Sequence, residues 1–253
     1  MTTGMASPKL SIFLPAYNEE EILEENCGRV LDALELLGME FELVIVDDTS
    51  TDRTPEIAAS LAERFDRVEF VRYENGPSRR ENLADALRRA RGGIVAFMDA
   101  DLATDLEALP RLVGAVEGGA DIATGDRYHP ESVIRRTAYR FAVSRMANAL
   151  VRAIFGSNIR DHFCGFKAFR ADRLWPLLDQ VGYDRAFMRG VLWDAELLLV
   201  AQRWGYRIEA IPIRWTEAPK TALRVRREAR LIPYLFKLWR RMHRLETKGA
   251  RDA

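Results

Sequence analysis

The 253-residue sequence has few cysteines and no excess of either charge, and each absence excludes a class of protein. The two cysteines, Cys27 and Cys164, provide neither a disulfide framework nor metal-type spacing, so we expect a reducing compartment. The 38 basic and 38 acidic residues cancel, and the overall charge therefore gives no reason to expect a nucleic-acid partner.

The sequence also has no apolar run near the ~20 residues that are needed to cross a bilayer. The longest candidate, residues 141–155, is interrupted by Arg145 and Arg152. Residues 1–10 lack the basic-then-apolar layout of a signal peptide, so we expect a cytoplasmic protein. No internal repeat or linker is visible, and we expect one catalytic domain over residues 1–220, followed by a C-terminal segment, residues 221–253, without a transmembrane helix.

Apolar runs and helical spacing alternate along the first half of the chain. They predict strands at residues 10–14, 41–46, 68–73 and 94–98, and helices at residues 22–37, 54–65 and 81–90. This alternation predicts a Rossmann-like α/β fold, with a mostly parallel sheet and helices on both faces. Further on, the pattern predicts helices at residues 106–116, 135–155 and 193–204, and strands at residues 121–125 and 206–215.

Two carboxylates, Asp99 and Asp101, follow the buried strand expected at residues 94–98. Strand alternation directs both to the same side, where they suit Mg²⁺ or Mn²⁺ bound to a diphosphate. An isolated Asp-x-Asp is more often a solvated turn. However, polar clusters at residues 15–19 and 47–50 also follow strands, and ligands of parallel sheets bind at the carboxyl ends of strands. The coincidence favours a functional site.

Six short motifs resemble, in their order, the family-two type of inverting glycosyltransferases, and within it the dolichyl- or polyprenyl-phosphate mannosyl- and glucosyltransferases. The matching segments are Pro15-Ala16-Tyr17-Asn18-Glu19, Val46-Asp47-Asp48 with Ser50 and Asp52, Asp99-Ala100-Asp101, Gly125-Asp126-Arg127-Tyr128, residues 161–169 and residues 194–198. The resemblance covers residues 11 to about 220 and implies the fold of nucleotide-diphospho-sugar transferases, with metal-dependent hexosyl transfer.

The resemblance also implies which residues bind the donor. The nucleotide-base pocket would be lined by Pro15, Tyr17, Glu19, Val46 and Asp48, and the diphosphate and its metal would lie at Asp99, Ala100 and Asp101. A tyrosine ring can stack on a base, and a carboxylate can accept its N–H groups. The family often has a glutamine where this chain has Ala103. We therefore expect the metal to bind firmly only when the donor's phosphates complete its coordination.

Several basic residues match the family's phosphate ligands. Arg127 corresponds to an arginine near the diphosphate and the acceptor, and Arg140 and Ser144 resemble the pair that holds the acceptor phosphate. Arg214 and Lys220 resemble a mobile basic pair that closes over the donor's phosphates. A lone arginine is otherwise a solvated surface charge, but Arg127 and Arg214 each follow a strand at the expected active-site edge.

Asp161, Asp194 and Glu196 are candidates for a catalytic base. A hydroxyl acceptor must lose a proton to become a good nucleophile, whereas a phosphate, with a second pKa near 6, is already ionised at neutral pH. If the acceptor is a phosphate, Asp194 and Glu196 are equally well explained as structural acids at the start of a helix.

The C-terminal segment is basic. Residues 221–253 hold ten basic and three acidic residues, a local net charge of +7. Leu235, Leu238 and Met242 recur at helical spacing between the cations, which predicts an amphipathic helix. Such a helix suits an anionic membrane surface, with roughly 1 kcal/mol available per cation. Docking on the domain or on a second subunit fits the pattern equally well.

Together these features predict an inverting transferase that moves mannose or glucose from GDP-mannose or UDP-glucose to polyprenyl phosphate, peripherally on the inner face of the cell membrane. One alternative is a soluble or glycan hydroxyl acceptor, and another is a non-catalytic nucleotide-sugar-binding protein. A sugar-phosphate nucleotidyltransferase is disfavoured, because residues 15–19 are not a glycine-rich basic loop. The sequence leaves open the donor base, the sugar, the lipid's length and the oligomeric state.

Overall fold

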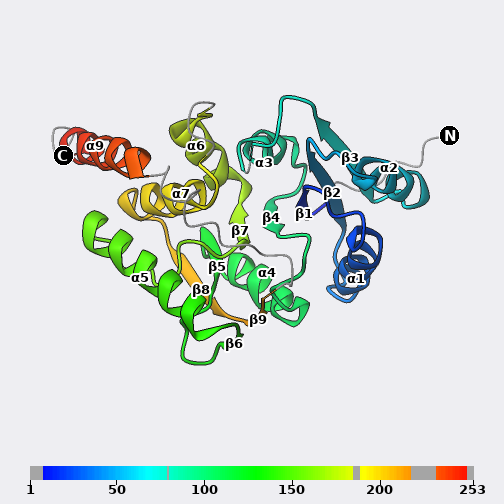
Figure 1. Ribbon diagram of the computed structural model, residues 1–253, viewed down its shortest axis with the longest axis horizontal. Coiled ribbons are helices and arrows are strands. Elements are labelled where there is room, and N and C mark those ends of the chain that lie inside the picture. Colours follow the sequence, from blue (N-terminus) through cyan, green and yellow to red (C-terminus); the bar gives the residue numbers. More distant parts are fainter. Residues whose placement is uncertain (1–7, 79, 185–188, 218–231, 250–253) are drawn as a thin grey trace.

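A computed structural model describes residues 8–78, 80–184, 189–217 and 232–249. In these residues the centre of the molecule is a seven-stranded sheet with helices on both faces (Figure 1). Its strands, in spatial order, are β3 (Val68–Tyr73), β2 (Phe41–Asp48), β1 (Leu10–Ala16), β4 (Ile94–Met98), β7 (Phe166–Arg170), β5 (Ile122–Asp126) and β8 (Ile208–Pro212). Only β7 runs antiparallel to its neighbours, so the predicted mostly parallel α/β sheet is confirmed.

The helices and two short 3₁₀ turns lie between these strands. They are α1 (Leu23–Glu35), α2 (Thr54–Arg64), α3 (Glu81–Ala86), η1 (Leu87–Arg89), η2 (Leu106–Ala108), α4 (Leu109–Glu117), α5 (Ala138–Phe155), α6 (Ala171–Val181), α7 (Val191–Arg203) and α9 (Ile232–Gly249). Each face of the sheet has its own core, because alternate residues of a strand point to opposite faces. On β1, Phe13 packs into one core, and Ile12 and Leu14 pack into the other.

The structure corrects two of the predicted elements and adds one that was not predicted. The helix predicted from residue 135 begins at Ala138, because β6 (Val133–Arg135) pairs with β9 (Arg214–Thr216). The strand predicted at residues 206–215 is therefore two strands, of which β8 pairs with β5 and β9 with β6. Helix α6 was not predicted, and it contains Pro176, a residue that usually ends or kinks a helix.

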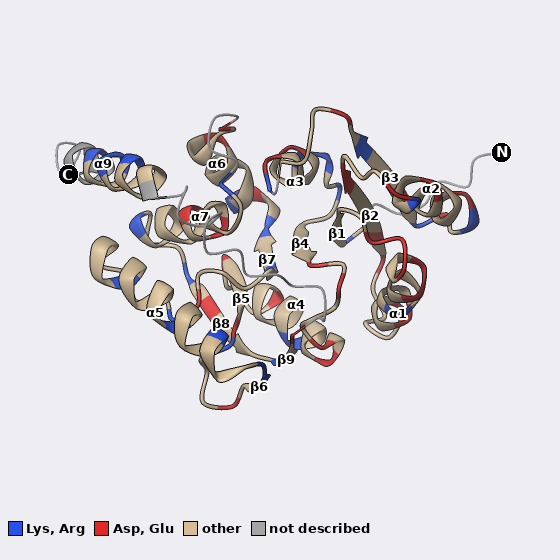
Figure 2. Cartoon of the chain, viewed as in Figure 1, with Lys and Arg blue, Asp and Glu red and all other residues tan. Residues whose placement is uncertain are grey.

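Helix α9 packs against α5 and α7. Tyr234, Leu238 and Met242, spaced by four residues, are buried in the core, whereas Phe236 and Trp239 are exposed. The predicted apolar side thus docks on the domain, and basic residues colour the rest of the helix in Figure 2. Residues 221–231 of the basic segment lie outside the described residues. Within the described part of the chain, no helix combines the length and the apolar character that spanning a membrane requires.

The second, two-stranded sheet extends the edge where β1, β2 and β4 end. The loop after Asp101 is hydrogen-bonded to β9, since Thr216 N donates to the carbonyl of Ala103 at 2.8 Å. An isolated bridge joins Thr104 to Trp215 beside it. Strands β6 and β9 are therefore fixed directly next to the Asp-x-Asp loop.

Candidate active site

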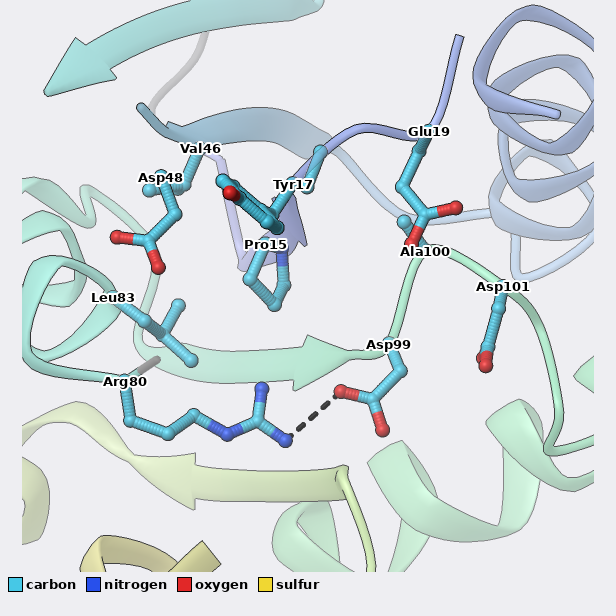
Figure 3. Close-up of a pocket in the computed structure, with 11 residues that line it drawn as sticks. Pro15, Tyr17, Glu19, Val46, Asp48, Arg80, Leu83, Asp99, Ala100 and Asp101 are labelled. Atoms are coloured by element: carbon cyan, nitrogen blue, oxygen red, sulfur yellow. Dashed lines mark hydrogen bonds and ion pairs between the residues drawn. The ribbon is translucent and has the colours of Figure 1, made fainter. Parts of the chain in front are cut away.

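A cavity of about 250 Å³ opens at the carboxyl ends of β1, β2 and β4. The structure brings together in its lining all eight residues that were predicted for the donor's base, diphosphate and metal, namely Pro15, Tyr17, Glu19, Val46, Asp48, Asp99, Ala100 and Asp101 (Figure 3). Ala16, Leu83 and Arg80 complete the lining. The position fits the rule that ligands of parallel sheets bind at the carboxyl ends of strands.

At the end of the cavity where the nucleotide base is predicted to bind, hydrogen bonds hold Asp48 in place. Ser78 donates to Asp48 through its backbone N–H, at 2.9 Å to Oδ2, and through its hydroxyl, at 2.7 Å to Oδ1. Asn82 Nδ2 donates to the same Oδ1 at 2.7 Å. The ring of Tyr17 is 44% exposed, so a face is accessible for stacking. Its neighbour Asn18 takes a left-handed φ of 57°, which turns the chain out of β1.

Asp99 and Asp101 stand at the other end of the cavity (Figure 3). The backbone N–H of Ala103 donates to Asp101 Oδ1 at 3.0 Å. Burial, and then the negative charge of Asp99, raise the pKa of Asp101 above its usual value. A cation between these carboxylates would relieve that repulsion, so their chemistry fits Mg²⁺ or Mn²⁺.

The protein supplies only part of a metal's coordination shell at this position. Among the described residues, no group of three or more histidine, cysteine or acidic side chains is placed to hold a metal ion. Ala103 contributes backbone contacts only, to Asp101 and to Thr216. Oxygen atoms of a bound diphosphate would have to complete the coordination, as predicted from the sequence.

Arg80 was missed by the sequence analysis. Its Nη2 pairs with Asp99 Oδ1 at 2.9 Å (Figure 3). Its Nε pairs with Asp194 Oδ2 at 3.1 Å. Burial lowers the pKa of Arg80, but the carboxylates of Asp194 and Asp99 outweigh burial and raise it, so the guanidinium stays charged. It lies 5.5 Å from the ring centre of Phe97. The guanidinium of Arg80 therefore already pairs with Asp99, a residue predicted to bind the metal.

Asp194 and Glu196 do not line the cavity. Both are fully buried. Asp194 joins Arg80 to Lys167, whose Nζ lies 3.2 Å from Asp194 Oδ1. Each carboxylate therefore holds neighbouring cations in place. This geometry favours the structural alternative over the catalytic base, and the base role remains a prediction.

Glu196 belongs to a second buried network. It pairs with Arg189 at 3.0 Å and with Arg241 of α9 at 2.7 Å, and Tyr234 donates to it. Arg189 in turn pairs with Glu81 at 2.6 Å. These contacts fasten α9 to α3 and α7, and Glu81 directly follows Arg80 in the chain.

Asp161, the third candidate base, is occupied by Arg127. The guanidinium binds its two oxygens at 2.7 and 2.8 Å. Burial raises the pKa of Asp161, but the charge of Arg127 outweighs burial and holds it below the usual value. Asp161 consequently stays ionised and orients Arg127, which lies 5.6 Å from the ring centre of Trp215.

The predicted acceptor residues Arg140 and Ser144 lie on α5 beside β9. Ser144 Oγ contacts the hydroxyl of Tyr128 at 2.7 Å and accepts from Arg136 Nη1 at 3.1 Å. Arg140 Nη1 pairs with Glu217 Oε1 at 2.7 Å. Arg136 and Glu217 were not predicted, because neither lies in a motif that marks it.

Of the predicted pair of donor-closing cations, Arg214 does not line the cavity. Arg214 is exposed on the surface and pairs with Glu107 at 2.9 Å. Lys220 lies outside the described residues. Their closure over the donor stays a prediction.

Comparisons with known proteins identify the family of this chain. A family model described as glycosyl transferase family 2 matches residues 11–193. Glycosyltransferase AglD of Haloferax volcanii is 38% identical over 213 residues, which cover 83% of this chain and 33% of that protein. Dolichol-phosphate mannosyltransferase of Pyrococcus furiosus is 34% identical over 167 residues, 65% of this chain and 47% of that protein. The chain thus spans about a third to a half of the length of these two relatives.

A third relative is covered more fully. Polyprenol monophosphomannose synthase of Mycolicibacterium smegmatis is 31% identical over 212 residues, 81% of this chain and 77% of that protein. Among solved structures, glucosyl-3-phosphoglycerate synthase from Mycobacterium tuberculosis, in complex with Mn²⁺, UDP-glucose and phosphoglyceric acid, has a TM-score of 0.65 at 20% identity. The match covers 93% of this chain and 80% of that chain, and it confirms the fold.

Proposed function

This chain belongs to glycosyl transferase family 2, and from that premise we propose that it transfers mannose or glucose from a nucleotide sugar to the phosphate of a polyprenyl phosphate. GDP-mannose and UDP-glucose are the donors that we expect. The names of two relatives, a dolichol-phosphate mannosyltransferase and a polyprenol monophosphomannose synthase, support this class of acceptor.

The observation that carries the proposal is a group of polar side chains next to a row of exposed apolar residues on α5. Arg140 and Ser144, together with Arg136 just before the helix, form this group, which we call the acceptor cradle. On the adjacent face of the helix, Tyr139, Met146 and Leu150 are 66%, 68% and 51% exposed. A phosphate held by the cradle leaves its hydrocarbon chain next to this stripe. Exposed apolar side chains in a row are typical of a surface that contacts lipid or protein.

The donor would bind across the cavity at the strand ends. Tyr17 and Asp48 both line this cavity, where Tyr17 would stack on the base and Asp48 would accept its N–H groups. Asp99 and Asp101 would hold Mg²⁺ or Mn²⁺, which neutralises the charge that develops on the departing nucleoside diphosphate. Arg127, oriented by Asp161, supplies a fixed positive charge between the donor and acceptor sides.

The acceptor needs no base in this reaction. A phosphate oxygen is already ionised at neutral pH and attacks the anomeric carbon opposite the leaving diphosphate, with inversion. The three carboxylates predicted as bases, Asp161, Asp194 and Glu196, are each buried in ion pairs with arginine or lysine. That arrangement supports a phosphate acceptor over a hydroxyl acceptor.

We also propose that the enzyme works at the membrane surface, on its cytoplasmic face. The outer side of α9 presents Phe236 and Trp239, stacked at 6.0 Å, beside Arg240 and Arg244. Aromatic side chains with neighbouring cations favour attachment to an anionic lipid surface. Co-sedimentation with anionic vesicles, but not with neutral ones, is the expected behaviour.

The experiment compares two lipids that differ only in the phosphate. Purified protein with Mn²⁺ and radiolabelled GDP-mannose or UDP-glucose is given undecaprenyl phosphate or undecaprenol. We expect labelled lipid from the phosphate only, and a loss of product of at least about 100-fold in Asp101→Asn, because this variant removes a charge from the metal site. Equal labelling of undecaprenol, or no labelled lipid from any nucleotide sugar, would contradict the proposal.

A further inference from the structure

The carboxylate of Glu217 occupies the centre of the acceptor cradle. Its Oε1 lies 2.7 Å from Arg140 Nη1 and 3.4 Å from Arg136 Nη2. The Glu217 side chain is only 13% exposed. Its backbone N–H donates to the carbonyl of Arg135 at 3.0 Å, so the register of β6 and β9 fixes the main chain there. The cradle therefore already holds an anion, and that anion belongs to the protein.

The cradle has more positive than negative charge. Arg127 is balanced by Asp161, whereas Arg136 and Arg140 share the single carboxylate of Glu217. Arg136 is nearly buried, with a side chain 9% exposed, and its Nε has no hydrogen-bond partner among the described residues. Burial, and then the charge of Arg127, lower the pKa of Arg136 from its usual value. Among the described residues, the site is therefore short of one negative charge and one hydrogen-bond acceptor.

A phosphate monoester supplies both of these. At neutral pH it carries about two negative charges on three terminal oxygens, whereas a carboxylate carries one charge on two. Arginine binds phosphate through paired N–H donors, and Arg136 presents Nη1 to Ser144, Nη2 to Glu217 and an unpartnered Nε. The 4.9 Å contact with the ring centre of Trp215 holds this guanidinium in place.

We propose that Arg136 is a further ligand of the acceptor's phosphate, and that Glu217 is a resident carboxylate which this phosphate displaces from the cradle. The inference rests on the proposed function for the identity of the acceptor. Only the side chain of Glu217 has to rotate away, since its backbone stays paired with Arg135. The exchange favours phosphate monoesters, which carry about two negative charges. A phosphate diester carries a single negative charge, the same as the Glu217 carboxylate that it would displace, so its binding would bring no additional negative charge to the cradle.

The first test removes the charge of Glu217 and measures phosphate binding directly. Calorimetry with inorganic phosphate compares Glu217→Gln with Glu131→Gln, an exposed acid on the neighbouring loop whose change removes the same charge. We expect Kd to fall about fivefold in Glu217→Gln and to stay unchanged in Glu131→Gln. An equal Kd in the two variants, or weaker binding in Glu217→Gln, overturns the displacement.

The second test concerns Arg136. With undecaprenyl phosphate as acceptor, we expect Arg136→Gln to raise the acceptor's KM at least about tenfold and to leave the KM of the nucleotide sugar unchanged. Arg136→Lys keeps the charge and should recover part of the loss. If Arg136→Gln does not fold, the test uses Arg136→Lys instead. If Arg136 binds the phosphate, this variant should raise the KM of the acceptor and leave the KM of the nucleotide sugar unchanged. An acceptor KM within twofold of the unmodified protein in the lysine variant contradicts the role of Arg136.

The two proposals fail in different ways. Unchanged phosphate binding in Glu217→Gln, together with labelled lipid from the unmodified protein, rejects the inference and keeps the transferase. Tighter phosphate binding in Glu217→Gln without lipid product from any donor supports an anion cradle and rejects the lipid acceptor. Free phosphate and lipid phosphate are thereby distinguished as occupants.

Discussion

The replacement Gly165→Ala tests whether the position of the Asp99 carboxylate controls activity. A methyl group on Gly165 would lie 2.1 Å from Asp99 Oδ2 and 2.6 Å from Oδ1. To reach the shortest ordinary contact of 3.4 Å, Oδ2 has to move by about 1.3 Å. This displacement breaks the 2.9 Å pair with Arg80 and shifts a predicted metal ligand. Because a misplacement of about 1 Å commonly costs on the order of 100-fold, we expect kcat/KM to fall by about that factor, or about 2.7 kcal/mol.

The assay measures kcat/KM for the nucleotide sugar over a range of Mn²⁺ concentrations, and the melting temperature alongside. Gly93→Ala is the matched control, since Gly93 directly precedes β4, the strand that leads to Asp99, and its methyl group would meet nothing within 4 Å. We expect the control to keep its activity and both variants to stay folded. If Gly165→Ala is folded and within threefold of the control at every Mn²⁺ concentration, the carboxylate's position does not govern the reaction.

Three further outcomes are expected. Arg80→Met removes the cation from Asp99, so calorimetry should show tighter Mn²⁺ binding without nucleotide, while kcat/KM falls about tenfold. Glu196→Gln leaves Arg189 short of a buried partner, so urea unfolding should show a loss of about 3 kcal/mol with kcat retained, and the reverse pattern would restore the base role. Burial lowers the pKa of His162 from 6.5 to about 4. As the pH falls, His162 is therefore protonated in the unfolded chain before it is protonated in the folded protein. The free energy of unfolding should fall by up to about 3 kcal/mol between pH 6.5 and pH 4, and this loss should be absent in His162→Gln.

The residues of the cavity were predictable because their signals are local. Three of the four strands expected in the first half end at a polar cluster, and a parallel sheet brings those ends to one edge. Knowing the order of elements was therefore enough to bring Tyr17, Asp48 and Asp99 into one cavity. The family resemblance gave their roles, and the strand pattern gave their positions.

The remaining residues depend on pairs that are distant in the sequence. Arg80 pairs with Asp194, 114 residues away, and Arg136 contacts Glu217, 81 residues away. The residues next to a charged residue in the sequence do not indicate its ion-pair partner. A lone charged residue is therefore interpreted as a solvated surface charge. Glu196 is a case of the same kind, because three neighbours from elsewhere in the chain, Arg189, Tyr234 and Arg241, were needed to recognise it as structural.

On each side of the predicted site, a side chain of the protein already pairs with one of the predicted ligand residues. Arg80 compensates Asp99 on the donor side, and Glu217 compensates Arg140 on the acceptor side. The Asp99 side chain is 47% exposed, so its pair with Arg80 is screened by solvent, whereas Glu217 is largely buried beside its arginines. In the proposed reaction each ligand would exchange one ion pair for another: a cation bound to a diphosphate would replace Arg80 at Asp99, and a phosphate would replace Glu217 at Arg140. The affinity for each ligand would then be the difference between two pairs, which would keep binding moderate and let the charged products leave.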